Sequence, residues 1–199
     1  MPDQPALNEY LDAIEASLRL ALAAPSPEVE PLYRMMQYHM GWLDETFVPA
    51  QASRGKRLRP LICLLACQAA GGDWHYALPA AAAIELVHNF TLIHDDIEDD
   101  SASRRHRTTL WKLWGIAQGV NTGDAMWAIA RRTLARSVPA LPPNTLLSII
   151  TELDEACLKL CHGQYLDISF ESSSQVTMHD YETMIAGKTA ALLASAAAC

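Results

Sequence analysis

Apolar residues recur three and four positions apart along almost the whole chain, between breaks made by proline and glycine. This spacing is typical of one face of an α-helix, whereas the strict alternation of a half-buried strand is nearly absent. The first such stripe ends at Pro25 and Pro27 and consists of Leu7, Leu11, Ile14, Leu18 and Leu22. The pattern therefore predicts an all-α protein.

Further helices are predicted over about 31–47, 61–70, 75–96, 124–136, 144–171 and from 177 onward. In the second of them, an inward stripe is formed by Met35, Met36, Met40 and Leu43. The segment 119–124 is interpreted as a turn in which Asn121 or Thr122 caps the following helix, with Asp124 structural rather than catalytic.

The stretch 85–107 carries an unusual distribution of charge. It begins as an apolar helix, its last turn holds five acids, and an arginine pair follows. Carboxylates at this end of a helix meet the negative pole of the helix dipole, and like charges one turn apart repel by about 0.2–0.5 kcal/mol. A cation is therefore expected to compensate them.

Spacing suggests which cation. Asp95 and Asp99 stand one turn apart on one face, and Asp96 lies about 100° to the side. Mg²⁺ is typically held by one or two carboxylates together with water and phosphate oxygens. The cluster predicts metal–phosphate chemistry, and the alternative is a solvated acidic helix end.

A basic segment precedes the apolar run 61–70 and has four cations within 54–59. Lys56 and Arg59 stand about one turn apart next to a helix start, which makes an anion site plausible. His88 lies two turns before Asp95 and shares its face. Two interpretations of His88 remain open, a phosphate contact and a satisfied core histidine.

Composition narrows the class of protein. One domain is the natural expectation for 199 residues of which 50% are apolar. The net charge of −8 argues against nucleic acid as the main partner. No basic apolar leader is seen, and no apolar run approaches the ~18 residues of a membrane span. We expect a cytoplasmic protein without a membrane span.

The five cysteines include two pairs one helical turn apart, Cys63 with Cys67 and Cys157 with Cys161. Cysteines paired in this way could hold a metal together with His162. Small buried core residues in a reducing cytoplasm are the favoured interpretation.

Five motifs together resemble the trans-isoprenyl diphosphate synthases, also called polyprenyl synthetases. They cover nearly the whole chain and lie at 55–60, 92–100 with 104–105, 123–124, 163–164 with Asp167, and 187–189. The resemblance implies an isoprenoid-synthase-type helical bundle around a central cavity. Residues 1–199 would then form a single incomplete domain without the C-terminal helices of that fold.

The resemblance also implies an activity, the Mg²⁺-dependent condensation of isopentenyl diphosphate with an allylic prenyl diphosphate. The product would be a short-chain trans-prenyl diphosphate of geranylgeranyl or farnesyl type, and the enzyme a homodimer. In this family the aspartate motif binds the Mg²⁺ ions that hold the allylic diphosphate, and here that motif is Asp95, Asp96 and Asp99.

The other motif residues acquire roles in the same way. The isopentenyl diphosphate site would comprise Lys56, Arg59, His88 and Arg105. The allylic diphosphate site would comprise Arg104, Lys188, Thr189, Gln164 and Asp167. Bulk five and four positions before the first aspartate limits product length in the family, which assigns that role to Phe90 and Thr91.

The chain departs from the family pattern in two places. His106 and Thr108 stand where a glycine and a proline usually follow the arginine pair. The family's second aspartate-rich motif lies some tens of residues beyond the Gly-Lys-Thr, and this sequence stops at Cys199. We therefore expect a fragment of a longer protein, or a chain that is inactive alone.

Three alternatives stay open. A class I terpene cyclase of the same fold would need no isopentenyl site. A non-catalytic subunit of a prenyl synthase would fit the short chain. A remote alternative is an HD-type metal phosphohydrolase, in which His94 would bind a metal.

Overall fold

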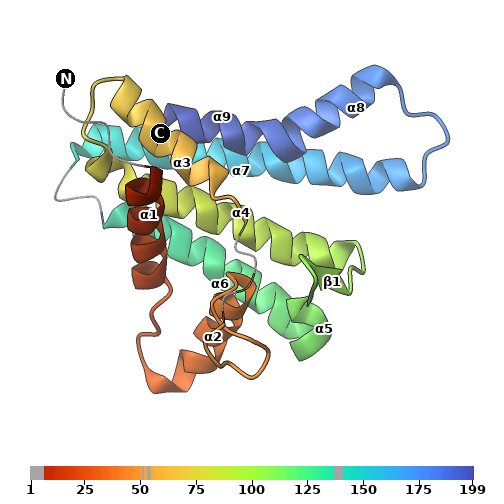
Figure 1. Ribbon diagram of the computed structural model, residues 1–199. Helices are drawn as coiled ribbons and strands as arrows, with labels where there is room; N and C mark the ends of the chain where they lie inside the picture. Colours follow the sequence, from red (N-terminus) through yellow and green to blue (C-terminus); the bar gives the residue numbers. More distant parts are fainter. Residues whose placement is uncertain (1–6, 51, 53–54, 137–140) are drawn as a thin grey trace.

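The computed structural model describes residues 7–50, 52, 55–136 and 141–199 (Figure 1). Its α-helices are α1 (Leu7–Ala21), α2 (Glu30–His39), α3 (Leu58–Ala69), α4 (Leu78–Glu98), α5 (Leu110–Trp114), α6 (Ile116–Ala135), α7 (Pro143–Glu171), α8 (Met178–Ile185) and α9 (Ala191–Ala198). Shorter helical turns are η1 (Pro27–Val29), η2 (Trp74–Ala77) and the π-helical η3 (Ala186–Ala190). In the described part of the chain the strands are β1 (Ser103–Arg104) and β2 (Arg107–Thr108), so the all-α prediction is confirmed.

Helix α4 forms the centre of the molecule. It packs along α6 and also contacts α1, α3, α7 and α9 (Figure 1). Every residue from 80 to 87 is buried, including Glu85. A helix that is apolar on all sides belongs in a core. Its last two turns are only partly buried, and the acid cluster begins there at Asp95.

The same helix bears on the expectation that the protein has no membrane span. Among the described residues, the stretch 74–98 is long and apolar enough to cross a membrane, with a mean hydropathy of 1.3 over an 18-residue window. However, 61% of that window is buried inside the protein. A core helix meets these criteria as readily as a membrane span does, so this helix is weak evidence for a membrane.

Helix α7 is the longest element, with 29 residues. After it, α8, η3 and α9 return along its side, and α9 also packs on α3 (Figure 1). Thr177 caps α8 in a reciprocal capping box with Asp180, which confirms the predicted start of this helix. Pro139, which separates the predicted helices 124–136 and 144–171, lies outside the described residues.

Two predicted boundaries are wrong. Helix α2 ends at His39 rather than near 47, because Gly41 turns the chain with a φ of 83°. Helix α6 begins at Ile116, so the segment 119–124 lies inside a helix and Thr122 is buried instead of capping. Gly119 lets α6 pack closely against α4, since a Cβ at this position would lie 2.7 Å from Ile97 Cδ1.

The cysteines follow the core interpretation only in part. Cys63 is buried, and burial raises the pKa of its thiol to about 12. Cys67 and Cys157 are half-buried, whereas Cys161 is exposed. The two pairs are therefore not equivalent.

Candidate active site

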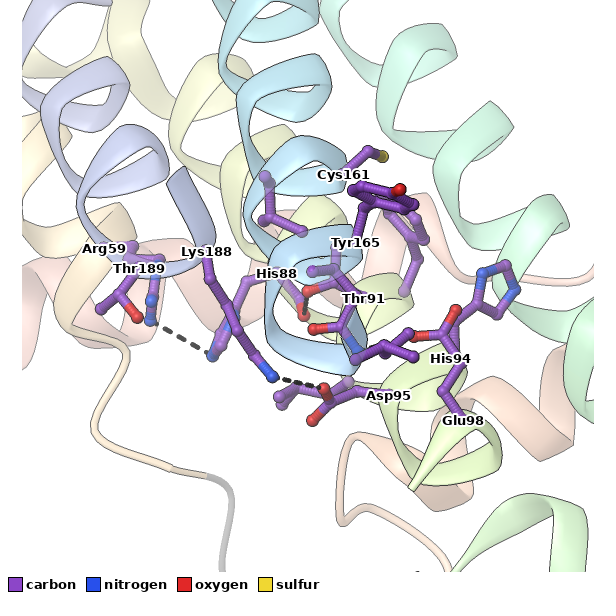
Figure 2. Close-up of a pocket in the computed structure, with 15 residues that line it drawn as sticks. Arg59, His88, Thr91, His94, Asp95, Glu98, Cys161, Tyr165, Lys188 and Thr189 are labelled. Carbon is purple, nitrogen blue, oxygen red and sulfur yellow. Dashed lines mark hydrogen bonds and ion pairs between the residues drawn. The ribbon is translucent and has the colours of Figure 1, made fainter. Parts of the chain in front are cut away.

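The end of α4 and the middle of α7 enclose a cavity of about 410 Å³, which η3 and the start of α3 complete (Figure 2). Its walls carry both charged and apolar side chains. The lining residues are Arg59, His88, Phe90, Thr91, Leu92, His94, Asp95, Glu98, Leu160, Cys161, Gln164, Tyr165, Ile168, Lys188 and Thr189.

Arg59 and His88 meet on one side of this cavity. The Arg59 Nη1 lies 3.2 Å from the His88 Nε2. Since a guanidinium only donates, the imidazole nitrogen accepts, which makes this histidine neutral with its proton on Nδ1. Burial, together with the neighbouring arginines, lowers the pKa of His88 to about 3. The structure thus brings two of the predicted phosphate contacts together.

Two cations compensate the clustered acids. Arg104 donates from Nε to Asp96 Oδ1 at 2.7 Å and from Nη2 to Asp95 Oδ2 at 3.0 Å. Lys188 Nζ lies 3.2 Å from Asp95 Oδ1 and also pairs with Asp167. Cations from two separate elements, Arg104 on β1 and Lys188 on η3, therefore compensate the repulsion inferred from the sequence.

The pKa shifts follow from these contacts. Burial raises the pKa of Asp96, and Arg104 opposes this shift. Burial and the nearby Asp95 raise the pKa of Asp99. For Lys188, burial lowers the pKa but the ion pairs with Asp167 and Asp95 raise it overall. The lysine therefore stays a cation.

The acids suit a magnesium ion in chemistry. Carboxylate oxygens are the ligands Mg²⁺ prefers, and Asp95 lines the cavity while Asp99 is exposed beside it. Asp96 is only 2% exposed and engaged by Arg104. Over the described ranges, no three His, Cys, Asp or Glu side chains converge as a ready-made metal cluster. Asp99 is exposed, whereas both Asp95 oxygens pair with cations, so an ion bound by Asp95 would share this carboxylate with Arg104 and Lys188.

The other predicted basic residues, Lys56 and Arg105, do not line the cavity. Lys56 is exposed on the loop before α3. The Arg105 guanidinium is half-buried against Gly55, where a Cβ would come within 3.0 Å of Nη2. Ser53 and Arg54, which begin the basic segment, lie outside the described residues.

A tight hairpin holds the arginine pair. Arg104 pairs with Arg107 across β1 and β2, and the two turn residues Arg105 and His106 have φ of 52° and 63°. Two positive φ values are the signature of a type I′ turn, which favours glycine. His106 thus adopts the left-handed conformation at a position where the resemblance predicts glycine. Arg107 anchors the hairpin by donating to the Tyr38 carbonyl oxygen at 2.7 Å.

Lys188 owes its position to a close helix crossing. A Cβ on Gly163 of α7 would lie 2.1 Å from the Lys188 nitrogen, and one on Gly187 would lie 2.7 Å from the Lys159 carbonyl oxygen. The approach coincides with the π-helical turn η3, a distortion frequent at functional sites. Two glycines therefore let the lysine reach Asp95.

The two residues assigned to product length line the cavity. Phe90 is 9% exposed, and its ring meets the His94 ring edge-on at 5.7 Å between centroids. Thr91 is half-buried and donates to the His88 carbonyl oxygen at 2.8 Å. Gln164 and Thr189 also line it, and the Gln164 amide donates to Glu98 Oε2 at 2.7 Å.

Sequence reasoning missed several lining residues. On α7 these are Leu160, Cys161, Tyr165 and Ile168, which share the three-and-four spacing of Gln164 and were detectable from it. On α4, His94 and Glu98 share this spacing with Thr91 and Asp95, but their contacts with Val120 and Gln164 are remote in sequence.

Comparison with known proteins places this geometry in context. The family model described as polyprenyl synthetase matches residues 40–199. The chain is 38% identical over 193 residues to a (2E,6E)-farnesyl diphosphate synthase of Mycobacterium bovis, covering 97% of this chain and 52% of the relative. It is 44% identical over 163 residues to a geranylgeranyl diphosphate synthase of Mycobacterium tuberculosis, covering 82% and 46%.

Solved structures agree. A polyprenyl synthetase from Streptomyces coelicolor A3(2) superposes with a TM-score of 0.87 at 35% identity, covering 96% of this chain and 54% of that one. A geranylgeranyl pyrophosphate synthetase from the archaeon Geoglobus acetivorans gives 0.85 at 34% identity, covering 96% and 57%. The chain thus spans about half the length of the relatives it matches. The fold is that of the isoprenoid synthases, and the chain belongs to the polyprenyl synthetase family.

Proposed function

We propose that this chain supplies one half of a prenyltransferase site that condenses isopentenyl diphosphate with an allylic diphosphate. The observation that carries the proposal is the cavity itself. An apolar wall leads to the carboxylate of Asp95, which Arg104 and Lys188 flank, while Arg59 and His88 form a second polar group. Two diphosphates and one apolar chain are the ligands that this arrangement fits.

The allylic diphosphate is assigned to the first group. Arg104 and Lys188 would bind its oxygens, with Gln164, Asp167 and Thr189 beside them, and Asp95 and Asp99 would hold Mg²⁺, with Asp96 fixing Arg104. Bound there, the ion would act as a Lewis acid that stabilises charge on the departing diphosphate. The residues themselves orient the leaving group and neutralise its charge.

Isopentenyl diphosphate is assigned to the second group, comprising Lys56, Arg59, His88 and Arg105. Arg59 and Arg105 offer planar donor pairs suited to phosphate, and Lys56 adds a mobile point charge. Neutral His88 donates through its other ring nitrogen without adding charge. Phe90 and Thr91 would limit the growing chain, which fits the short-chain names of the relatives.

We further infer a cytoplasmic homodimer. The central helix is buried among the protein's own helices, which supports a soluble protein. Helix α6 leaves Val120 and Trp127 exposed by 42% and 40%, an apolar face on which a second copy could pack.

The alternatives differ in what they require. A terpene cyclase would not need Arg59 beside His88. An HD-type phosphohydrolase would need His94 among the acids, but its Nε2 lies 3.2 Å from the Val120 carbonyl oxygen on α6. A non-catalytic subunit would not need a neutralised acid cluster in a cavity.

The test uses the protein at its native length, with labelled isopentenyl diphosphate and geranyl diphosphate. We expect a longer prenyl diphosphate, no product with a chelator, and about a 10²-fold or greater loss for Lys188→Ala. Glu155→Gln, an exposed acid outside the cavity, is the matched control and should retain activity. A hydrocarbon formed from the allylic diphosphate alone would overturn the proposal in favour of a cyclase.

A further inference from the structure

Helix α4 presents two different stripes to the cavity. His88, Thr91 and Asp95 form a polar stripe, because they recur at three and four positions. Phe90 and His94 are one turn apart and are rotated about 100° from Thr91 and Asp95. The second stripe is aromatic, and it faces α6.

The His94 ring is seated against α6 by three contacts. Its Nε2 lies 3.2 Å from the Val120 carbonyl oxygen and 3.6 Å from Asp124 Oδ1. A carbonyl oxygen only accepts, so Nε2 carries the proton. Beneath the ring lies Gly123, where a Cβ would come within 2.2 Å of Nε2 and 2.4 Å of Cδ2. Only glycine leaves room for the ring at this place.

The seated ring in turn supports Phe90. The two rings meet edge-on at an interplanar angle of 81°, the arrangement that aromatic pairs prefer. Figure 2 shows Arg59 and Lys188 on one side of the cavity and His94 on the opposite side. A ligand whose diphosphate binds the cations would therefore extend its apolar chain toward the aromatic pair.

We propose that Gly123 and His94 set the length of apolar chain that this cavity accepts, with His94 lining the far end and Gly123 positioning it. The inference rests on the proposed function, because it assumes a ligand with a diphosphate head and an apolar tail. It goes beyond the roles of Phe90 and Thr91, because it attributes the limit on chain length to a contact between α4 and α6.

The geometry gives the two residues opposite effects. A methyl group at Gly123 forces the ring away from α6, and the open direction is the cavity, so the space for the chain shortens. Alanine at His94 removes the ring and leaves Phe90 without its neighbour, so the space lengthens. Because the methyl group acts only through the ring, Gly123→Ala should have no effect on chain length once His94 is alanine.

The experiment measures the affinities of saturated alkyl diphosphates of five, ten, fifteen and twenty carbons for the protein at its native length, by calorimetry with Mg²⁺. Each methylene excluded from the cavity weakens binding about fourfold. Gly123→Ala should therefore lose affinity about fourfold to tenfold for the longest ligand that wild type accepts, with the shortest unchanged. His94→Ala should gain affinity for the next longer ligand.

Gly119→Ala is the matched control. It lies one turn earlier on α6, and its Cβ would strike Ile97, which does not line the cavity. It should change thermal stability but not the chain-length profile. Circular dichroism verifies that each variant folds. If Gly123→Ala fails to fold, His94→Ala still decides the test, because it adds no bulk.

The outcomes separate the two claims. If wild type binds the series and the variants leave its profile unchanged, this inference is wrong and the proposed function stands. If the double variant still shows the shift of Gly123→Ala, the methyl group does not act through His94. If wild type binds no alkyl diphosphate of any length, the proposed function fails, and this inference fails with it.

Discussion

Replacing Gly163 by alanine should disable the diphosphate end of the cavity while leaving the fold intact. The new Cβ would lie 2.1 Å from the Lys188 nitrogen and 2.7 Å from the Gly187 carbonyl carbon. Both neighbours are backbone atoms, so no side chain can rotate away. Since ordinary contact begins at 3.4 Å, η3 must move by about 1.3 Å.

Both consequences can be estimated. Overpacking of this kind costs about 1–3 kcal/mol, and each kcal/mol lowers the Tm of a chain of this size by about 2–4 °C. A displacement of about 1 Å in a positioned group costs about 10²-fold in rate, and the 3.2 Å pair between Lys188 and Asp95 would not survive it.

Thermal melts followed by circular dichroism and steady-state prenyl transfer measure the two effects separately. The control is Gly72→Ala, whose Cβ would meet the flexible Cys67 Sγ at 2.9 Å and the Cys67 backbone carbonyl oxygen at 3.2 Å, and neither residue lines the cavity. It should lose stability without losing activity. Wild-type kcat/KM for Gly163→Ala would refute the argument that this crossing positions Lys188.

The remaining predictions concern buried ionisable residues, the hairpin and the cavity residue Phe90. Arg57 and Glu85 are 6% and 4% exposed and lie 2.7 Å apart, so Arg57→Met should cost about 3–5 kcal/mol in urea unfolding, and adding Glu85→Gln should recover part of it. Burial, with nearby Arg105 and Arg104, lowers the pKa of His39 to about 3, so the folded state binds fewer protons than the unfolded state below pH ~6.5. The contribution of neutral His39 to stability is complete above that pH and is lost as the pH falls toward 3. His39→Gln should therefore make the free energy of unfolding depend less on pH between about 3 and 6.5. An unchanged slope would contradict the lowered pKa of His39. His106→Gly should stabilise by about 1 kcal/mol in a thermal melt, because it relieves a φ of 63°, and a lower Tm would argue against the turn. Phe90→Ala should lengthen the product seen by mass spectrometry, and an unchanged distribution would count against its role in limiting the product length.

The sequence was most informative where neighbours in space are neighbours on one helix. Asp95, Asp99 and His88 could be placed on one face by counting turns. The repulsion between the carboxylates predicted that a cation compensates them. The all-α class followed from periodicity alone. Such inferences need only the geometry of a single helix.

Contacts between helices were beyond that reasoning. The glycines at 119 and 123 suggested a turn, because a sequence does not distinguish a glycine that bends the chain from one that admits a neighbour. Likewise, nothing in the sequence linked Gly163 to Lys188, or Arg57 to Glu85 inside the core. Each of these pairs depends on how two helices cross.

The central claim is that two separate polar groups of this cavity bind two diphosphates at once. Calorimetry with isopentenyl diphosphate and a non-reactive allylic thiolodiphosphate, alone and together, tests it directly. The account predicts that each binds with the other present, that Arg59→Ala weakens only the first, and that Lys188→Ala weakens only the second. Mutual exclusion of the two ligands, or equal loss of both in either variant, would contradict it.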